Sequence, residues 1–108
     1  MNPTTAALTA LFERIPRRHS ADNVAEINSI VSEYEELLIS IEAVNAYYEK
    51  AMPVFFDELD GVRANIKKST DNKANKKNKD VFFDEASGAL KDSMQALMEV
   101  YGDGERTA

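Results

Sequence analysis

Carboxylates are the most numerous side chains in this sequence that could do chemistry. The 108 residues include 19 Asp and Glu but one histidine and no cysteine. Two carboxylates can act as general acid and general base when a pocket separates their pKa values. Glu33, Glu35 and Glu36 instead lie close together in a strongly polar segment, which is typical of a solvated helix face. Such a face can attract a cation or a basic partner, but it predicts no acid–base pair.

His19, the single histidine, is a weak candidate for catalysis. It follows Pro16 and two arginines in a predicted turn, where side chains are usually exposed. No Gly-x-Ser-x-Gly motif accompanies it, and a helical di-iron site would need two Glu-x-x-His pairs. The sequence therefore predicts no catalytic residue and no enzymatic activity.

Metal and phosphate sites are not expected either. The acidic run over residues 57–61 has some calcium-loop character, but Leu59 stands where an oxygen ligand is needed and the closing glutamate is missing. Without cysteine there is no thiolate ligand, and no phosphate-binding glycine loop occurs. We expect neither a bound metal nor another cofactor.

The elements that carry these residues are predicted to be helices. Apolar residues recur at steps of three and four between residues 20 and 51, which is typical of a bundle or coiled-coil helix. This seam consists of Ile27, Ile30, Tyr34, Leu37, Ile41, Val44 and Tyr48. Further amphipathic helices are predicted at about residues 3–15, 53–68 and 80–101. Pro53 should kink or break the chain where the long helix meets the next one.

A small antiparallel bundle accounts for this pattern. The predicted fold is all-α, one domain of three to four helices with residues 20–51 as the long central helix. Residues 69–79 are too rich in lysine and asparagine to pack in a core, so a flexible connector is expected there. Residues 102–108 are expected to fray. Because a chain this short has a modest core, we also expect a homodimer that buries the seam.

A five-residue motif, VFFDE, occurs twice, over residues 54–58 and 81–85. Each copy is followed three residues later by a glycine, Gly61 or Gly88. The motif suits a helix start that anchors its aromatics in the core, and the sharper alternative is two equivalent docking ends. Glycine within a helix costs about 1 kcal/mol relative to alanine, which favours a close helix crossing at each site.

Charge is unevenly distributed along the chain. The formal net charge is −6, to which residues 20–60 contribute −9, residues 61–80 contribute +5, and the two terminal segments contribute +2 and −4. The anionic part should attract basic partners and repel nucleic-acid phosphates. The lysine-rich segment has no aromatic residue on which a base could stack, so we expect a solvated linker and no direct binding of nucleic acid.

These features favour a protein that binds the basic surface of another protein. The predicted contact residues are acids and aromatics of the long helix and its continuation: Glu33, Glu35, Glu36, Glu42, Tyr47, Phe55, Asp57 and Glu58. Small adaptors, chaperones and inhibitors all fit this description. The alternative is a nucleic-acid mimic of phage or plasmid type, whose acids would block a host protein that binds DNA or RNA.

The sequence gives no sign of membrane insertion. No apolar run approaches the ~18 residues that a membrane span needs. The lack of cysteine is consistent with the reducing cytoplasm, where we expect the protein to act.

Overall fold

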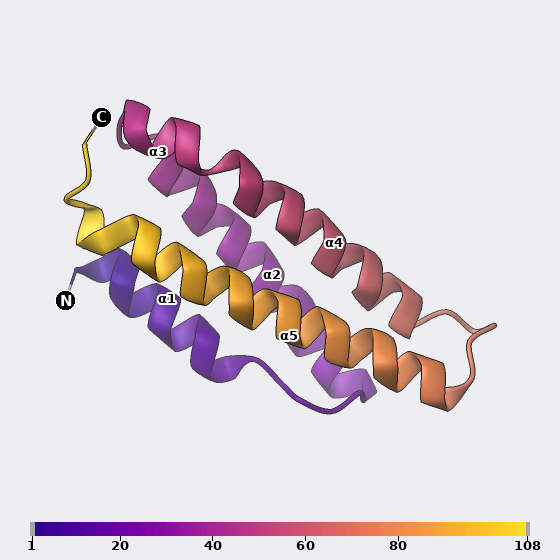
Figure 1. Ribbon diagram of the computed structural model, residues 1–108. Coiled ribbons are helices and arrows are strands. Elements are labelled where there is room, and N and C mark those ends of the chain that lie inside the picture. The colour runs from indigo at the N-terminus through magenta and orange to yellow at the C-terminus, as the bar shows by residue number, and fades with distance from the viewer. Residues whose placement is uncertain (1, 108) are drawn as a thin grey trace.

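The chain forms a bundle of antiparallel α-helices (Figure 1). The computed structural model describes residues 2–107, and this part contains helices and turns but no strand. In chain order, the elements are α1 (Pro3–Arg14), α2 (Ala21–Glu42), α3 (Ala46–Ala51), α4 (Pro53–Ser69), α5 (Lys76–Tyr101) and the 3₁₀ turn η1 (Gly102–Gly104). The predicted all-α bundle is confirmed.

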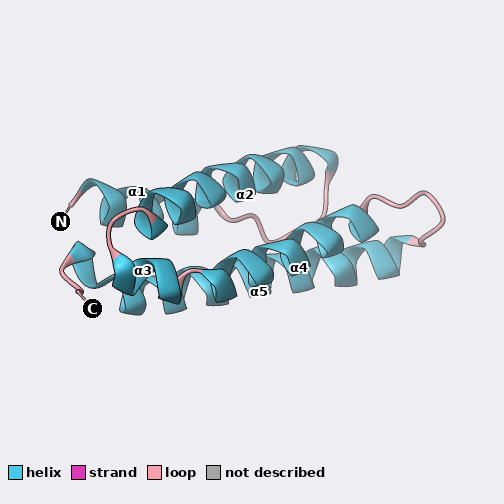
Figure 2. Ribbon diagram, turned by 90° about the horizontal axis from the view of Figure 1, so that it is seen from above, coloured by secondary structure: helices cyan, strands magenta, loops and turns pink. Residues whose placement is uncertain are grey.

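The helices form two layers around one core. Figure 2 shows α1 and α2 in one layer and α3, α4 and α5 in the other. α1 and α4 each pack against both α2 and α5, so the four main helices close a ring. Tyr34, Tyr48 and Phe83 are the largest side chains that lie fully inside it. Burial of these side chains and their aliphatic neighbours is the main stabilising term.

Most helices begin at a side-chain cap. The side chains of Asn2, Ser20, Asn45 and Asn75 each accept a hydrogen bond from the backbone N–H three residues ahead. Pro3 and Pro53 occupy the first position of α1 and α4, where the missing N–H costs nothing. These local signals fix where the chain can turn.

The long central helix was predicted incorrectly. α2 ends at Glu42, and the chain reverses through Ala43 and Val44 before Asn45 caps α3. The predicted interruption at Pro53 does occur: α3 ends at Ala51, α4 begins at Pro53, and the chain bends at Met52 while keeping helical backbone angles there. The chain thus reverses direction just before Asn45, eight residues ahead of the proline that was expected to break the helix. The longest helix is α5, with 26 residues.

The predicted seam is only partly the core face of α2. Five of its residues are buried, whereas Leu37 is half-buried and Val44, in the turn, is 55% exposed. Val31 and Leu38 are buried in addition. A straight helix repeats every 3.6 residues, so a strict pattern of threes and fours drifts off the buried face. The buried seam residues pack within the chain's own core, which leaves no continuous seam for a coiled-coil dimer.

Both polar segments are more ordered than predicted. α5 starts at Lys76 because Asn75 caps it, so the connector spans only residues 70–75. Gly102 ends α5 in a left-handed conformation, and the residues after it are hydrogen-bonded to other elements. The prediction of a frayed tail is thus wrong for residues 102–106, and Ala108 lies outside the described residues.

The two VFFDE motifs are not equivalent. The first lies in the first turns of α4 and the second begins at the sixth residue of α5. Phe55 is buried in the first copy but Phe83, one position later, is buried in the second. A Cβ atom at Gly61 or Gly88 would meet nothing within 4 Å, so the predicted close crossings are wrong.

Candidate partner-binding surfaces

The predicted contact residues do not form one surface. Glu33 and Glu36 face a groove between α1 and α2, and Glu35 points toward α4. Glu58 bonds to α5, and Phe55 is 3% exposed, so it belongs to the core.

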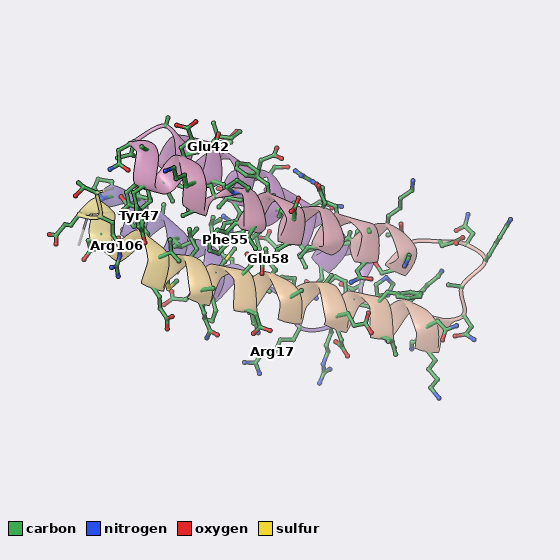
Figure 3. All side chains as sticks on the ribbon, turned by 45° about the horizontal axis from the view of Figure 1, so that its top comes forward. Arg17, Glu42, Tyr47, Phe55, Glu58 and Arg106 are labelled. Atoms are coloured by element: carbon green, nitrogen blue, oxygen red, sulfur yellow. The ribbon has the colours of Figure 1, made fainter. Side chains whose placement is uncertain are left out.

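The remaining three predicted contact residues lie elsewhere on the surface. Glu42 is half-buried at the end of α2, and Asp57 is exposed on α4. Figure 3 shows Tyr47 near Arg106, where both line a shallow depression. The linear order of the sequence thus grouped residues that the fold distributes around the bundle.

The α1/α2 groove is the site that combines apolar and acidic residues. It encloses about 430 Å³. Its apolar lining comes from Ala7, Ala10, Leu11 and Leu37, and its polar lining from Arg14, Glu33, Glu36 and Ser40. Grooves with an apolar floor and a few polar groups are the usual form of a binding site.

The groove exists because α1 presents small side chains next to α2. Ala7 and Ala10 lie three residues apart, on one side of α1, and both are exposed. Their methyl groups are too short to cover Leu37, which is why this leucine is half-buried while Leu38 is fully buried. Sequence reasoning missed the site because the position of α1 cannot be read from α2. The signal was the alanine pair on an otherwise amphipathic helix.

Arg14 fixes one end of the groove through two ion pairs. Its Nη2 lies 2.9 Å from a Glu26 carboxylate oxygen, and its Nη1 lies 2.9 Å from a Glu33 carboxylate oxygen. The hydrogen bond to Glu26 is the largest cause, and the one to Glu33 the next, of a raised pKa of the Arg14 guanidinium. Among the described residues, Glu36 lines the same groove without an ion pair of its own. It is the carboxylate there that a basic partner could use.

A second arginine connects α2 to α4. Arg63 Nη1 lies 2.9 Å from Glu35 Oε2, and this hydrogen bond lowers the pKa of the Glu35 carboxyl. Both side chains are more than a third exposed, so the pair adds little to stability but sets how α2 and α4 align.

A short chain of hydrogen bonds crosses the core. Ser93 Oγ donates to Glu58 Oε1 at 3.2 Å, which leaves the Tyr34 hydroxyl to donate to Ser93 Oγ at 2.8 Å. Burial raises the pKa of Tyr34, partly offset by the bond to Ser93. These two hydrogen bonds link α2, α5 and α4. They also satisfy the buried Tyr34 hydroxyl, which would be costly to bury without a partner.

His19 is less exposed than predicted. Its ring packs edge-on against Phe83, with 5.7 Å between centroids, and its Nδ1 lies 3.8 Å from Asp80 Oδ1. The packing gives it a structural role in covering the core. Over residues 2–107, no group of three or more His, Asp or Glu side chains is placed to hold a metal ion.

Comparisons with known proteins returned no relatives. The chain matches no family model, no curated protein and no solved structure. Among the described helices, none is both long and apolar enough to cross a bilayer.

Proposed function

We propose that this chain is a non-enzymatic protein-binding module. The α1/α2 groove would receive an apolar segment of another protein that carries basic residues beside its apolar ones. The observation that carries the proposal is the apolar floor formed by Leu11 and Leu37 next to the acidic Glu33 and Glu36. An amphipathic helix laid in a groove is a common form of peptide recognition.

The proposal assigns different roles to the two kinds of lining. Burying Leu37 would supply affinity, because apolar contact is the main driving force of association. The carboxylates would select the partner and its orientation, since interface charges contribute more to specificity than to affinity. Adaptors, chaperones and inhibitors remain compatible with such a site.

The nucleic-acid mimic remains the alternative, and the ion pairs weigh against it. A mimic needs a regular row of free negative charges that imitates phosphates. Arg14 and Arg63 neutralise three of the acids along α2, and Ser29 and Ser32 separate the acidic clusters on its exposed side.

The cytoplasmic location also stays a prediction.

A defined peptide tests the groove directly. We would titrate the chain with a 15-residue helical peptide in which leucines on one face are flanked by lysines, and follow amide shifts by NMR. Shifts should be confined to α1 and the second half of α2. The same peptide with glutamates in place of the lysines should bind at least tenfold more weakly.

Two substitutions to arginine provide the matched comparison. Ala10→Arg fills the groove from an exposed helical position and should abolish binding of the lysine peptide. Ala89→Arg makes the same change at an exposed site on α5 and should leave binding unchanged. Equal binding by both variants would contradict the proposal. Binding that disappears at about 0.5 M salt for every variant would support the mimic instead, since apolar contacts survive screening by salt.

A further inference from the structure

The bundle is basic at one end and acidic over the rest of the molecule. Both termini lie at one end, and the turn between α4 and α5 lies at the other (Figure 1). Residues 67–80, around that turn, contain six lysines and two aspartates, a net charge of +4. Because the whole chain carries −6, the rest of the molecule carries −10. We call residues 67–80 the basic end.

The outer face shared by α2 and α4 contains both signs in order. The Glu35–Arg63 pair sets the alignment of these antiparallel helices. One turn from this pair toward the termini lie Ile39 and Asp60, followed by Glu42. One turn in the other direction lies Lys67, followed by the turn that contains Lys73. The face is therefore acidic on one side of the pair and basic on the other.

An exposed apolar side chain lies on the acidic half of this face. Ile39 is 53% exposed. Helix geometry places Glu35 one turn before it and Glu42 nearly one turn after it, so the isoleucine is bordered by carboxylates. A partner for this position needs an apolar or aliphatic contact together with positive charge, and a lysine stem with its ammonium group supplies both.

We infer that this face binds a second copy of the chain, antiparallel, about a two-fold axis near the Glu35–Arg63 pair. This arrangement places Lys67 of each copy opposite Asp60 of the other, and Lys73 opposite Glu42. Two-fold symmetry makes each attraction occur twice. The inference is independent of the proposed function, because the α1/α2 groove lies on the other side of α2 and stays open.

Size and charge pattern favour a second copy over other partners. The molecule extends 47 × 24 × 17 Å, so contact along its length can approach the ~800 Å² per partner of a standard interface, whereas end-to-end contact cannot. A polyanion such as nucleic acid would be repelled by the acidic half of the face. When a second copy is turned end over end, its basic half faces the acidic half of the first copy, and the reverse.

Charge-reversal pairs test the inference. The first variant is Lys67→Glu/Lys73→Glu, and the second is Glu42→Lys/Asp60→Lys. Each alone places like charges opposite each other and should sediment at 12.1 kDa, whereas the wild type should approach twice that mass at low salt. An equimolar mixture should regain the dimer mass, because the reversed charges then match. Circular dichroism checks that each variant is folded.

Controls separate a specific face from net charge. Lys50→Glu/Lys91→Glu makes the same change in charge away from this face and should keep the dimer mass. A wild type that stays at 12.1 kDa, a mixture that stays monomeric, or a mass that grows beyond the dimer would overturn the inference. So would a monomeric wild type that binds a duplex oligonucleotide through Lys67 and Lys73. The peptide test of the α1/α2 groove is separate, so failure of the dimer would leave the proposed function standing.

Discussion

The end of the bundle that holds both termini is joined by hydrogen bonds, whereas the basic end is not joined in this way. Asn2 Nδ2 donates to Tyr101 Oη at 3.1 Å and to the Asp103 carbonyl at 2.6 Å. Tyr48 Oη donates to the Tyr101 carbonyl and accepts from the Arg106 N–H. We call this network the terminal clamp. It connects α1, α3 and the segment after α5.

At the basic end, direct hydrogen bonds between elements are few. Outside residues 67–80, Ser87 Oγ donates to the Pro16 carbonyl at 3.0 Å, and His19 contacts Asp80 and Phe83, so that the α1–α2 link is held against α5. The lysines there are largely exposed. Neutral, directional bonds thus fix the geometry at one end, and the other end presents charge that a partner can neutralise.

The clamp depends on three consecutive residues in the left-handed region. Gly102, Asp103 and Gly104 have φ of 53°, 59° and 80°, and they fold the chain back over α5. A Cβ atom on Gly104 would lie 2.9 Å from Tyr101 Oη. Only glycine fits this position, and the bonds from Asn2 and Thr5 hold Asp103 in its less favourable conformation.

Among the substitutions that compare the two ends, Tyr48→Phe in the terminal clamp should lower stability most. Tyr48 is fully buried, and removing its hydroxyl leaves a carbonyl and an N–H without their partner. We expect a loss of about 2 kcal/mol in the free energy of unfolding, measured with urea. Tyr47→Phe, on the half-buried neighbour, is the control and should cost almost nothing. Equal costs would mean that the clamp contributes no stability.

Alkaline pH tests the middle of the bundle, between the two ends. Because the folded pKa of Tyr34 is raised above its ordinary value of 10.0, the folded state keeps this proton longer than the unfolded state does. The associated stability is present below pH 10 and is lost as the pH rises further. The melting temperature of the wild type should fall more between pH 9 and pH 11 than that of Tyr34→Phe. Parallel falls would contradict the assignment.

Ser87→Ala removes the hydrogen bond between α5 and the α1–α2 link, which lies nearer to the basic end than the terminal clamp does. One partly buried hydrogen bond is lost, so we expect a cost of about 1 kcal/mol, less than for Tyr48→Phe. Urea unfolding under the same conditions gives the comparison. A cost above that of Tyr48→Phe would show that the basic end is the more firmly held of the two.

The smallest effect should come from lengthening the turn at the basic end. Inserting Gly-Ser-Gly-Ser between Asn72 and Lys73 extends a turn whose hydrogen bonds are local, within the turn itself and to the adjoining ends of α4 and α5, and should cost about 0.5 kcal/mol. The same insertion between Ala43 and Val44 displaces Asn45, which donates to the Arg106 carbonyl, and should cost more. Melting temperatures that fall equally would remove the distinction between the ends.

The parts of the fold that could be predicted from sequence were those set by nearby residues. Pro53 marked the boundary between two helices, and the apolar periodicity identified the helices. The reversal at Asn45 was missed because the apolar spacing continues through Val44 to Tyr48. A turn that leaves this spacing unchanged cannot be detected from periodicity. Asn45 and Asn75 were the available signals, since asparagine is a strong N-cap.

The candidate site could be predicted only in part. Glu33 and Glu36 were identified as contact residues, and they do line one groove. Leu37 and Leu38 are chemically identical, so the sequence of α2 alone cannot say which one meets the core. That choice depends on where α1 packs and on how small Ala7 and Ala10 are, which is a property of the assembled bundle.

The most direct test of the account compares Leu38→Ala with Leu37→Ala by urea unfolding. Leu38 lies in the core, whereas Leu37 lies on the floor of the α1/α2 groove. Leu38→Ala should then cost roughly 2–5 kcal/mol, and Leu37→Ala less than about 1 kcal/mol. Only Leu37→Ala should weaken binding of the lysine peptide without loss of fold. An equal or larger loss of stability for Leu37→Ala would contradict the account.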